Sequence, residues 1–195
     1  MPESNDKVIR SIFKKGNKIL WPYLITVDPG LTGTGFALWR SFETNCQNIK
    51  KMFLISSGIL NDKSSADWLK RSCNLATMLR NIIDIHFPKR AEFTLVCEST
   101  HLWESSNKSQ TSVRGGDLFK LTTLIGMFVN EVHRLGASDV LLIHENTWKG
   151  SLPKPIVEKR INKLLGKIIL SHAADAVGIG LSLAGLLSSD KRGEK

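Results

Sequence analysis

Four side chains have the chemical types and positions needed to gather around a divalent cation: Asp28, Glu98, His172 and Asp175. Asp28 and Glu98 each end a short apolar run that favours a β-strand. If those strands are neighbours in one sheet, the two carboxylates meet at the same edge, where their repulsion demands a cation. His172 and Asp175 are three residues apart, which puts them on one face of a helix, at its first turn.

An oxygen-rich cluster of this kind suits Mg²⁺ or Mn²⁺. Two such ions about 4 Å apart activate a water molecule and stabilise the leaving oxygen of a phosphodiester, so phosphodiester hydrolysis is the implied reaction. Each residue also has an ordinary explanation. An Asp before Pro-Gly is most often a turn residue, and a His or Asp in a first helical turn is most often a cap.

The elements that must position these side chains follow from the apolar runs and the turn residues. The predicted strands cover residues 24–28, 33–39, 52–60, 93–97 and 140–143. The short turns between the first three favour an antiparallel meander. Helical spacing then alternates with the later strands, which predicts an α/β fold with a five-stranded mixed sheet flanked by helices.

Four helices are expected, beginning near Ser64 or Ser65, Asp117, Pro153 and Ser171. The last one contains Gly178 and Gly180, each of which weakens an isolated helix by roughly 1 kcal/mol. We therefore expect this helix to pack closely against the sheet, which brings Asp175 toward Asp28.

Length and charge limit the classes of protein to which the chain can belong. The chain has 195 residues, which suits one compact domain, and it carries 27 Lys and Arg against 18 acidic residues. The net charge of +9 favours a polyanionic partner such as nucleic acid, although a basic surface kept for solubility explains it as well. Cys46, Cys73 and Cys97 are an odd number without close pairs, which fits neither a disulfide framework nor a zinc cluster and suits a reducing cytoplasm.

The chain divides into a basic N-terminal arm (1–22), a nuclease-like domain (23–188) and a polar tail (189–195). The arm lacks the apolar core and cleavage site of a secretion signal. Residues 168–187 have the length and apolarity of a membrane span, but they contain His172 and Asp175, and charge inside lipid is costly. We expect no membrane insertion.

Three segments, in this order, resemble the catalytic pattern of the RuvC-type Holliday junction resolvases, which have an RNase H-like fold. They are Ile25-Thr26-Val27-Asp28-Pro29-Gly30 followed by Gly33-Thr34-Gly35, then Val96-Cys97-Glu98, and His172-Ala173-Ala174-Asp175-Ala176. The resemblance spans Leu24 to Leu187 and implies that Asp28, Glu98, His172 and Asp175 are both catalytic residues and metal ligands. Many family members have Asp where this chain has His172. We expect neutral His172 to ligate one metal or to orient the attacking water.

The resemblance further implies a homodimer that resolves four-way DNA junctions by paired nicks, with two Mg²⁺ or Mn²⁺ ions in each active site. Family members insert a residue into the junction shortly after the catalytic Glu. His101 and Trp103 occupy that neighbourhood, and Trp103 either stacks on bases as a wedge or folds back on the core. Candidate phosphate contacts are Lys108, Arg114, Lys149 and Lys154, joined by Lys159, Arg160 and Lys163.

Two other classes of protein fit part of the pattern. The turn Asp28-Pro29-Gly30-Leu31-Thr32 also resembles the phosphate loop of actin-like ATPases and sugar kinases, but no second phosphate loop or second domain follows. A catalytically silent junction-binding module would share the basic surface but would not need the full acidic set. The basic arm and residues 148–150 depart from the compact bacterial form, which suggests a phage or other mobile-element member acting in the bacterial cytoplasm.

Overall fold

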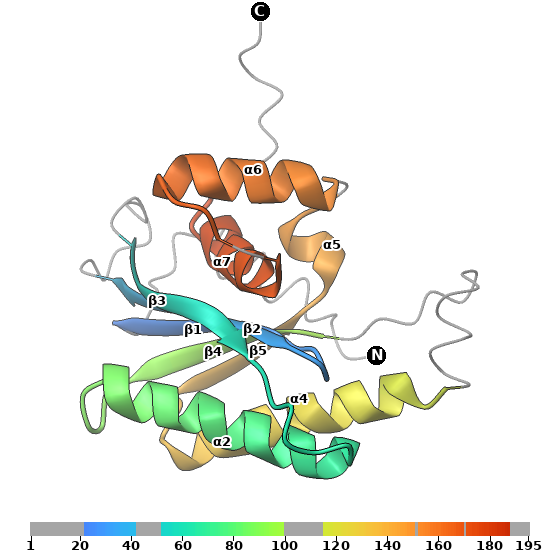
Figure 1. Ribbon diagram of the computed structural model, residues 1–195. Coiled ribbons are helices and arrows are strands. Elements are labelled where there is room, and N and C mark those ends of the chain that lie inside the picture. The colour runs from blue at the N-terminus through green and yellow to red at the C-terminus, as the bar shows by residue number, and fades with distance from the viewer. Residues whose placement is uncertain (1–21, 42–51, 100–114, 151, 170, 188–195) are drawn as a thin grey trace, which may run out of the picture.

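One mixed sheet of five strands, in the order β3-β2-β1-β4-β5, forms the middle of the protein (Figure 1). The computed structural model describes residues 22–41, 52–99, 115–150, 152–169 and 171–187. The strands are β1 (Tyr23–Asp28), β2 (Thr34–Ser41), β3 (Met52–Leu60), β4 (Phe93–Glu98) and β5 (Asp139–Ile143). β1, β2 and β3 pair antiparallel, whereas β4 runs parallel to both β1 and β5. The predicted mixed sheet with an antiparallel meander is confirmed.

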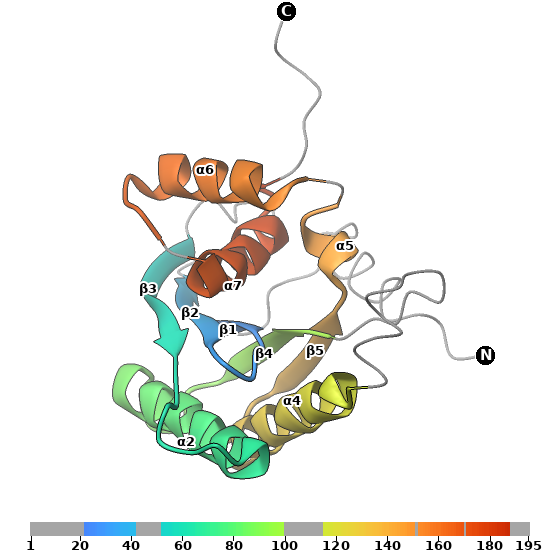
Figure 2. The ribbon, with the colours of Figure 1, turned by 45° about the vertical axis from the view of Figure 1, so that its right-hand side comes forward.

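Helices cover both faces of this sheet (Figures 1 and 2). On one face lie α2 (Trp68–His86) and α4 (Asp117–Arg134), and on the other lies α7 (Ser171–Leu183). Two further helices, α5 (Glu145–Trp148) and α6 (Lys154–Leu165), pack around α7, and α6 lies on the side of α7 away from the sheet. The sequence did not predict α5, because a single turn of helix is too short for a periodic pattern.

The alternation of side chains along β1 and β4 assigns each residue to one of the two faces. Ile25 and Val27 of β1 belong to the hydrophobic cluster with α2 and α4, whereas Leu24 belongs to the cluster with α7. In β4, Val96 packs on the α7 side as well. The same alternation puts the last residues of the two strands, Asp28 and Glu98, on the α7 face.

Two predicted helix starts were wrong by one to three residues. The N-cap of α2 is Asp67, whose side chain accepts hydrogen bonds from the backbone N–H groups of Leu69 and Lys70. Ser64, one of the two expected caps, instead donates to Asp62. Asp is as good an N-cap as Ser, so a run of several candidate caps cannot be ranked from sequence. The N-cap of α4 is Gly116, in a left-handed conformation, and Asp117 is its first helical residue.

α7 lies so close to the sheet that two positions have no room for a side chain. A Cβ atom on Gly180 would lie 2.4 Å from the Trp39 ring of β2, and one on Gly35 of β2 would lie 1.9 Å from the backbone oxygen of His172. Gly178 faces away from the sheet and instead contacts the ring of Trp148 in α5. The expectation of close packing is confirmed, although only Gly180 of the two helix glycines meets the sheet.

A buried hydrogen bond joins α7 to the middle of β1. Thr26 Oγ1 donates to the backbone oxygen of Ala176 at 2.7 Å and accepts from Trp39 Nε1 at 3.0 Å. Thr26 is fully buried, so both bonds satisfy polar atoms that would otherwise lose their contact with water. The bond holds Ala176, the neighbour of Asp175, against β1, the strand that ends in Asp28.

Within the described segments, no helix combines the length and the hydrophobicity needed to span a membrane. The apolar stretch considered above contains the 13-residue helix α7, whose residues 173–181 are buried in the protein core.

The close packing of α7 predicts opposite outcomes for two Gly-to-Ala substitutions inside helices. Gly126 in α4 is exposed and a Cβ there meets nothing within 4 Å, so Gly126→Ala should stabilise the protein by about 1 kcal/mol. Gly180→Ala gains the same helix propensity but pushes a methyl group into Trp39, and should destabilise by roughly 1–2 kcal/mol net. Urea unfolding of both variants measures the difference, and equal effects would contradict the packing described.

Candidate metal centre

Three of the four predicted ligands converge at the end of β1. Asp28, His172 and Asp175 each offer one ligand atom, and these atoms lie within 4.8 Å of one another. His172 Nδ1 is 2.8 Å from Asp28 Oδ2, at hydrogen-bonding distance. The two aspartates are each only 8% exposed. Because α7 begins at Ser171, Asp175 lies just beyond the first turn of the helix, and the expectation that it lies within that turn was wrong.

The turn after β1 lies next to the imidazole ring of His172. Thr34 Oγ1 donates to the backbone oxygen of Gly30 at 2.9 Å and accepts from its N–H at 3.2 Å. A Cβ on Gly30 would lie 2.4 Å from the backbone oxygen of Gly33 and 3.8 Å from the imidazole. Gly30 is therefore required by the close approach of the Gly33 backbone within the turn, whereas a Cβ there would be in ordinary contact with the imidazole.

Glu98, the fourth predicted ligand, lies at the same sheet edge but outside this cluster of three. β1 and β4 are parallel neighbours with Val27 opposite Cys97, so Asp28 and Glu98 end side by side, as predicted. Glu98 Oε2 accepts a hydrogen bond of 2.7 Å from Nε1 of Trp148 in α5. Burial, and then the charge of Asp28, raise the pKa of Glu98 to about 7, although the Trp148 bond opposes that shift.

A lysine already contributes positive charge to the centre. Lys154, the first residue of α6, donates from Nζ to Asp175 Oδ2 at 2.5 Å. Burial alone would lower the pKa of Lys154, but the hydrogen bond and charge of Asp175, with the charge of Asp28, raise it overall. The sequence predicted that Lys154 points outward to bind phosphate, whereas in this structure it pairs with a predicted metal ligand.

The donor set fits a hard divalent cation. Asp175 Oδ1 is buried and has no hydrogen-bond partner in the described part of the chain. Burial raises the pKa of Asp28 despite its bond to His172, because the low-dielectric surroundings and nearby Asp175 disfavour its charge. The ammonium of Lys154 contacts Asp175, the imidazole of His172 contacts Asp28, and the indole of Trp148 contacts Glu98. Carboxylate oxygens with a neighbouring imidazole are ligands that suit Mg²⁺ or Mn²⁺.

Of the other predicted DNA contacts, Lys149 falls within the described residues. His101, Trp103, Lys108 and Arg114 fall outside them. Lys149 forms an ion pair with Glu145 one turn earlier in α5, and its ammonium is 5.7 Å from the centre of the Trp148 ring.

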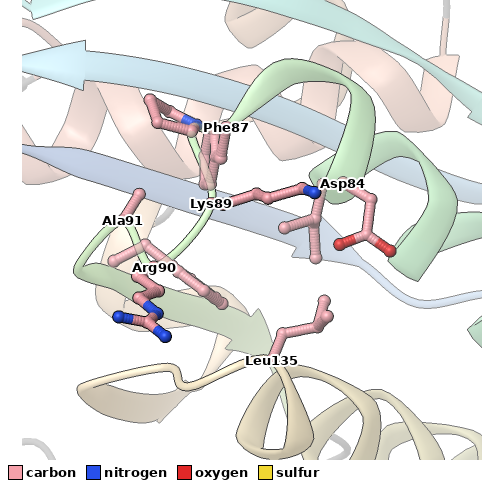
Figure 3. Close-up of a pocket in the computed structure, with 9 residues that line it drawn as sticks. Asp84, Phe87, Lys89, Arg90, Ala91 and Leu135 are labelled. Carbon is pink, nitrogen blue, oxygen red and sulfur yellow. The ribbon is translucent and has the colours of Figure 1, made fainter.

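A pocket of about 380 Å³ lies away from the candidate centre (Figure 3). It is lined by the end of α2, by the turn that contains Lys89 and Arg90, by Phe93 and by Leu135. Phe93 is the first residue of β4 and Glu98 is the last, so the pocket and the carboxylates are at opposite ends of that strand. None of the four predicted ligands lines the pocket, which is therefore separate from the candidate metal centre.

Sequence reasoning missed the contact of Trp148 with Glu98. No site role was predicted for Trp148, although a Trp between polar residues carries a usable signal. When an indole ring is buried, its N–H needs an acceptor, and a nearby buried carboxylate is a natural one. The pairing of Lys154 with Asp175 had no comparable signal, because it depends on how α6 packs against α7.

Comparison with known proteins identifies the fold. No family model and no curated sequence matches this chain. A solved complex of Thermus thermophilus RuvC with a Holliday junction substrate superposes with a TM-score of 0.59 at 16% identity, covering 82% of this chain and 90% of that one. A further RuvC structure from the same organism gives the same score and identity, with 92% of that chain covered. The yeast mitochondrial Holliday junction resolvase gives 0.53 at 11% identity, covering 95% and 88%. The chain has the RuvC-type RNase H-like fold that its motifs predicted.

The raised pKa of Glu98 predicts how stability depends on pH without divalent cations. The folded state binds the Glu98 proton more tightly than the unfolded state, so this contribution to stability is present below about pH 4.5 and is lost as pH rises through about 7. Glu98→Gln removes the charge and keeps an acceptor for Trp148. We expect the variant to gain roughly 1–3 kcal/mol over the wild type at pH 8 and little at pH 4, because one pKa unit corresponds to about 1.4 kcal/mol.

Urea unfolding across this pH range in EDTA measures the difference. Glu92→Gln, at an exposed position just before β4, is the matched control and should follow the wild type. A Glu98→Gln curve parallel to that of the wild type at every pH would contradict the assignment of a costly buried charge to Glu98.

Proposed function

We propose that this protein is a metal-dependent endonuclease that resolves four-way DNA junctions. The observation that carries the proposal is the buried set of carboxylates where β1, β4 and α7 meet, in a fold shared with a RuvC whose solved complex contains a Holliday junction substrate. The net charge of +9 supports a nucleic-acid partner. The acidic set supports catalysis over a silent binding module, which would have no use for three buried carboxyl groups.

Asp28, Glu98 and Asp175 would hold the cation, with His172 beside them. Bound Mg²⁺ or Mn²⁺, in one or two positions, would supply the charge that activates water and stabilises the leaving oxygen of the phosphodiester. With an ionised Asp28 and a neutral imidazole, Nδ1 of His172 would donate to Asp28 Oδ2 and the lone pair would be on Nε2. His172 is 41% exposed, and Nε2 is therefore suited to accept a proton from a water molecule at the scissile phosphate.

Lys154 has two successive partners in this proposal. Its ammonium neutralises Asp175 in the structure described here. A bound divalent cation would supply positive charge to Asp175 and would weaken its attraction to Lys154. The half-exposed Lys154 side chain would then be able to contact a DNA phosphate, which reconciles its observed position with the phosphate contact expected from sequence.

Cutting both strands of a junction requires two active sites, so we propose that two copies of the chain act together. Trp103 is proposed as the residue that stacks in the junction, with His101, Lys108, Arg114 and Lys149 as further DNA contacts. Trp103→Ala should then weaken junction binding about 5- to 150-fold, because stacking of one base on an aromatic ring contributes about 1–3 kcal/mol. Unchanged junction affinity in a gel-shift titration would remove the wedge from the proposal.

The direct test compares cleavage of a synthetic four-way junction with cleavage of a linear duplex, in Mg²⁺, in Mn²⁺ and in EDTA. We expect symmetric nicks near the crossover that require metal and fall at least 100-fold in Asp28→Asn. Asp84→Asn changes an exposed aspartate near the end of α2 and should cut like the wild type. Tight junction binding without nicks in either metal would favour the silent module, and absence of binding would reject both readings.

A further inference from the structure

Trp148 makes a contact that joins two distant parts of the chain at the candidate centre. It is the last residue of α5, is only 5% exposed, and donates from Nε1 to Glu98 Oε2 at 2.7 Å across 50 residues of sequence. A neutral donor bonded to a carboxylate at this distance forms one of the stronger hydrogen bonds in proteins. The bond occupies one of the two oxygens of Glu98.

The Trp148 ring is held in place by the helices around it. A Cβ atom on Gly178 of α7 would lie 2.6 Å from ring atom Cζ3, and the same position is 3.2 Å from Ile161 of α6. Because Gly178 has no side chain, the indole ring fits between α5, α6 and α7. Because the ring is packed on several sides, its N–H points in one fixed direction.

This bond fixes the direction of one carboxylate oxygen of Glu98. An indole N–H is a donor only, and the packed ring gives it one orientation, so Oε2 of Glu98 is held toward Trp148. Asp28 and Glu98 end neighbouring parallel strands, so the carboxyl group fixed in this way lies at the strand ends where Asp28 also lies.

We infer that Trp148 is a positioning residue for Glu98: its indole N–H holds one carboxylate oxygen and so directs the other toward the cation shared with Asp28 and Asp175. The inference deepens the proposed function and rests on the metal centre proposed there. It assigns Trp148, which the sequence left without a role, to the support of the proposed catalytic carboxylate.

A second tryptophan provides a matched control. Trp39 in β2 is 1% exposed, packs on Gly180 of the same helix α7, and donates from Nε1 to Thr26 Oγ1 at 3.0 Å. Trp39→Phe therefore removes the same N–H and the same part of the ring from the same hydrophobic cluster. Its acceptor is a neutral hydroxyl group that is no candidate metal ligand.

The test measures Mn²⁺ affinity of the full-length protein by calorimetry at pH 7, beside urea unfolding of each variant in EDTA. Trp148→Phe should bind Mn²⁺ roughly 10-fold more weakly, because a hydrogen bond to a charged group is lost. Trp39→Phe should lose stability yet bind Mn²⁺ within twofold of the wild type. In a Glu98→Gln background, Trp148→Phe should change the affinity no further.

The remaining outcomes distinguish failure of the positioning role from failure of the proposed metal centre. Wild-type affinity in Trp148→Phe, or an equal loss in Trp39→Phe, would overturn the positioning role and leave the metal centre standing. Absence of Mn²⁺ binding by the wild type would overturn both. If Trp148→Phe does not fold, the indole N–H resonances of the wild type decide: on addition of Mg²⁺, the Trp148 resonance should shift more than that of Trp39. Equal or absent shifts would overturn the inference.

Discussion

The close contact between α7 and the sheet is the constraint on which the site depends. The hydroxyl of Thr26 bonds the helix backbone at Ala176, Gly35 lets β2 approach the backbone of His172, and Gly180 leaves room for the Trp39 ring. A helix held this near delivers His172 and Asp175 to the end of β1, where Asp28 already lies. A larger residue at either glycine would move the helix outward and separate the ligands. Backbone packing therefore sets the spacing of the carboxylates.

Holding the buried carboxyl groups this close to one another costs electrostatic free energy. Asp28 and Glu98 both have raised pKa values, chiefly because burial removes the water that would solvate their charges. Lys154 offsets part of the repulsion at Asp175, and the indole of Trp148 offsets part at Glu98. One oxygen of Asp175 still has no partner among the described residues. Native proteins keep such buried groups where function requires them, and a bound cation would remove most of the cost.

The sequence predicted the features that depend on local patterns. Asp28 and Glu98 end apolar runs, and runs of this kind become neighbouring strands whose last residues share an edge. The glycines of the last helix indicated close packing. The pairings of Trp148 with Glu98 and of Lys154 with Asp175 could not be predicted, because they depend on how a single helical turn and α6 pack against α7. The exact helix starts were missed because several residues near each start are equally good caps.

The central claim, that the carboxylates at the junction of β1, β4 and α7 form a divalent-cation site, is tested most directly by crystals soaked in Mn²⁺ and measured at the manganese absorption edge. We expect an anomalous peak roughly 2.0–2.4 Å from oxygens of Asp28 and Asp175, with Lys154 displaced from Asp175. A fully ordered site that keeps the Lys154 to Asp175 ion pair and shows no peak at saturating Mn²⁺ would contradict it.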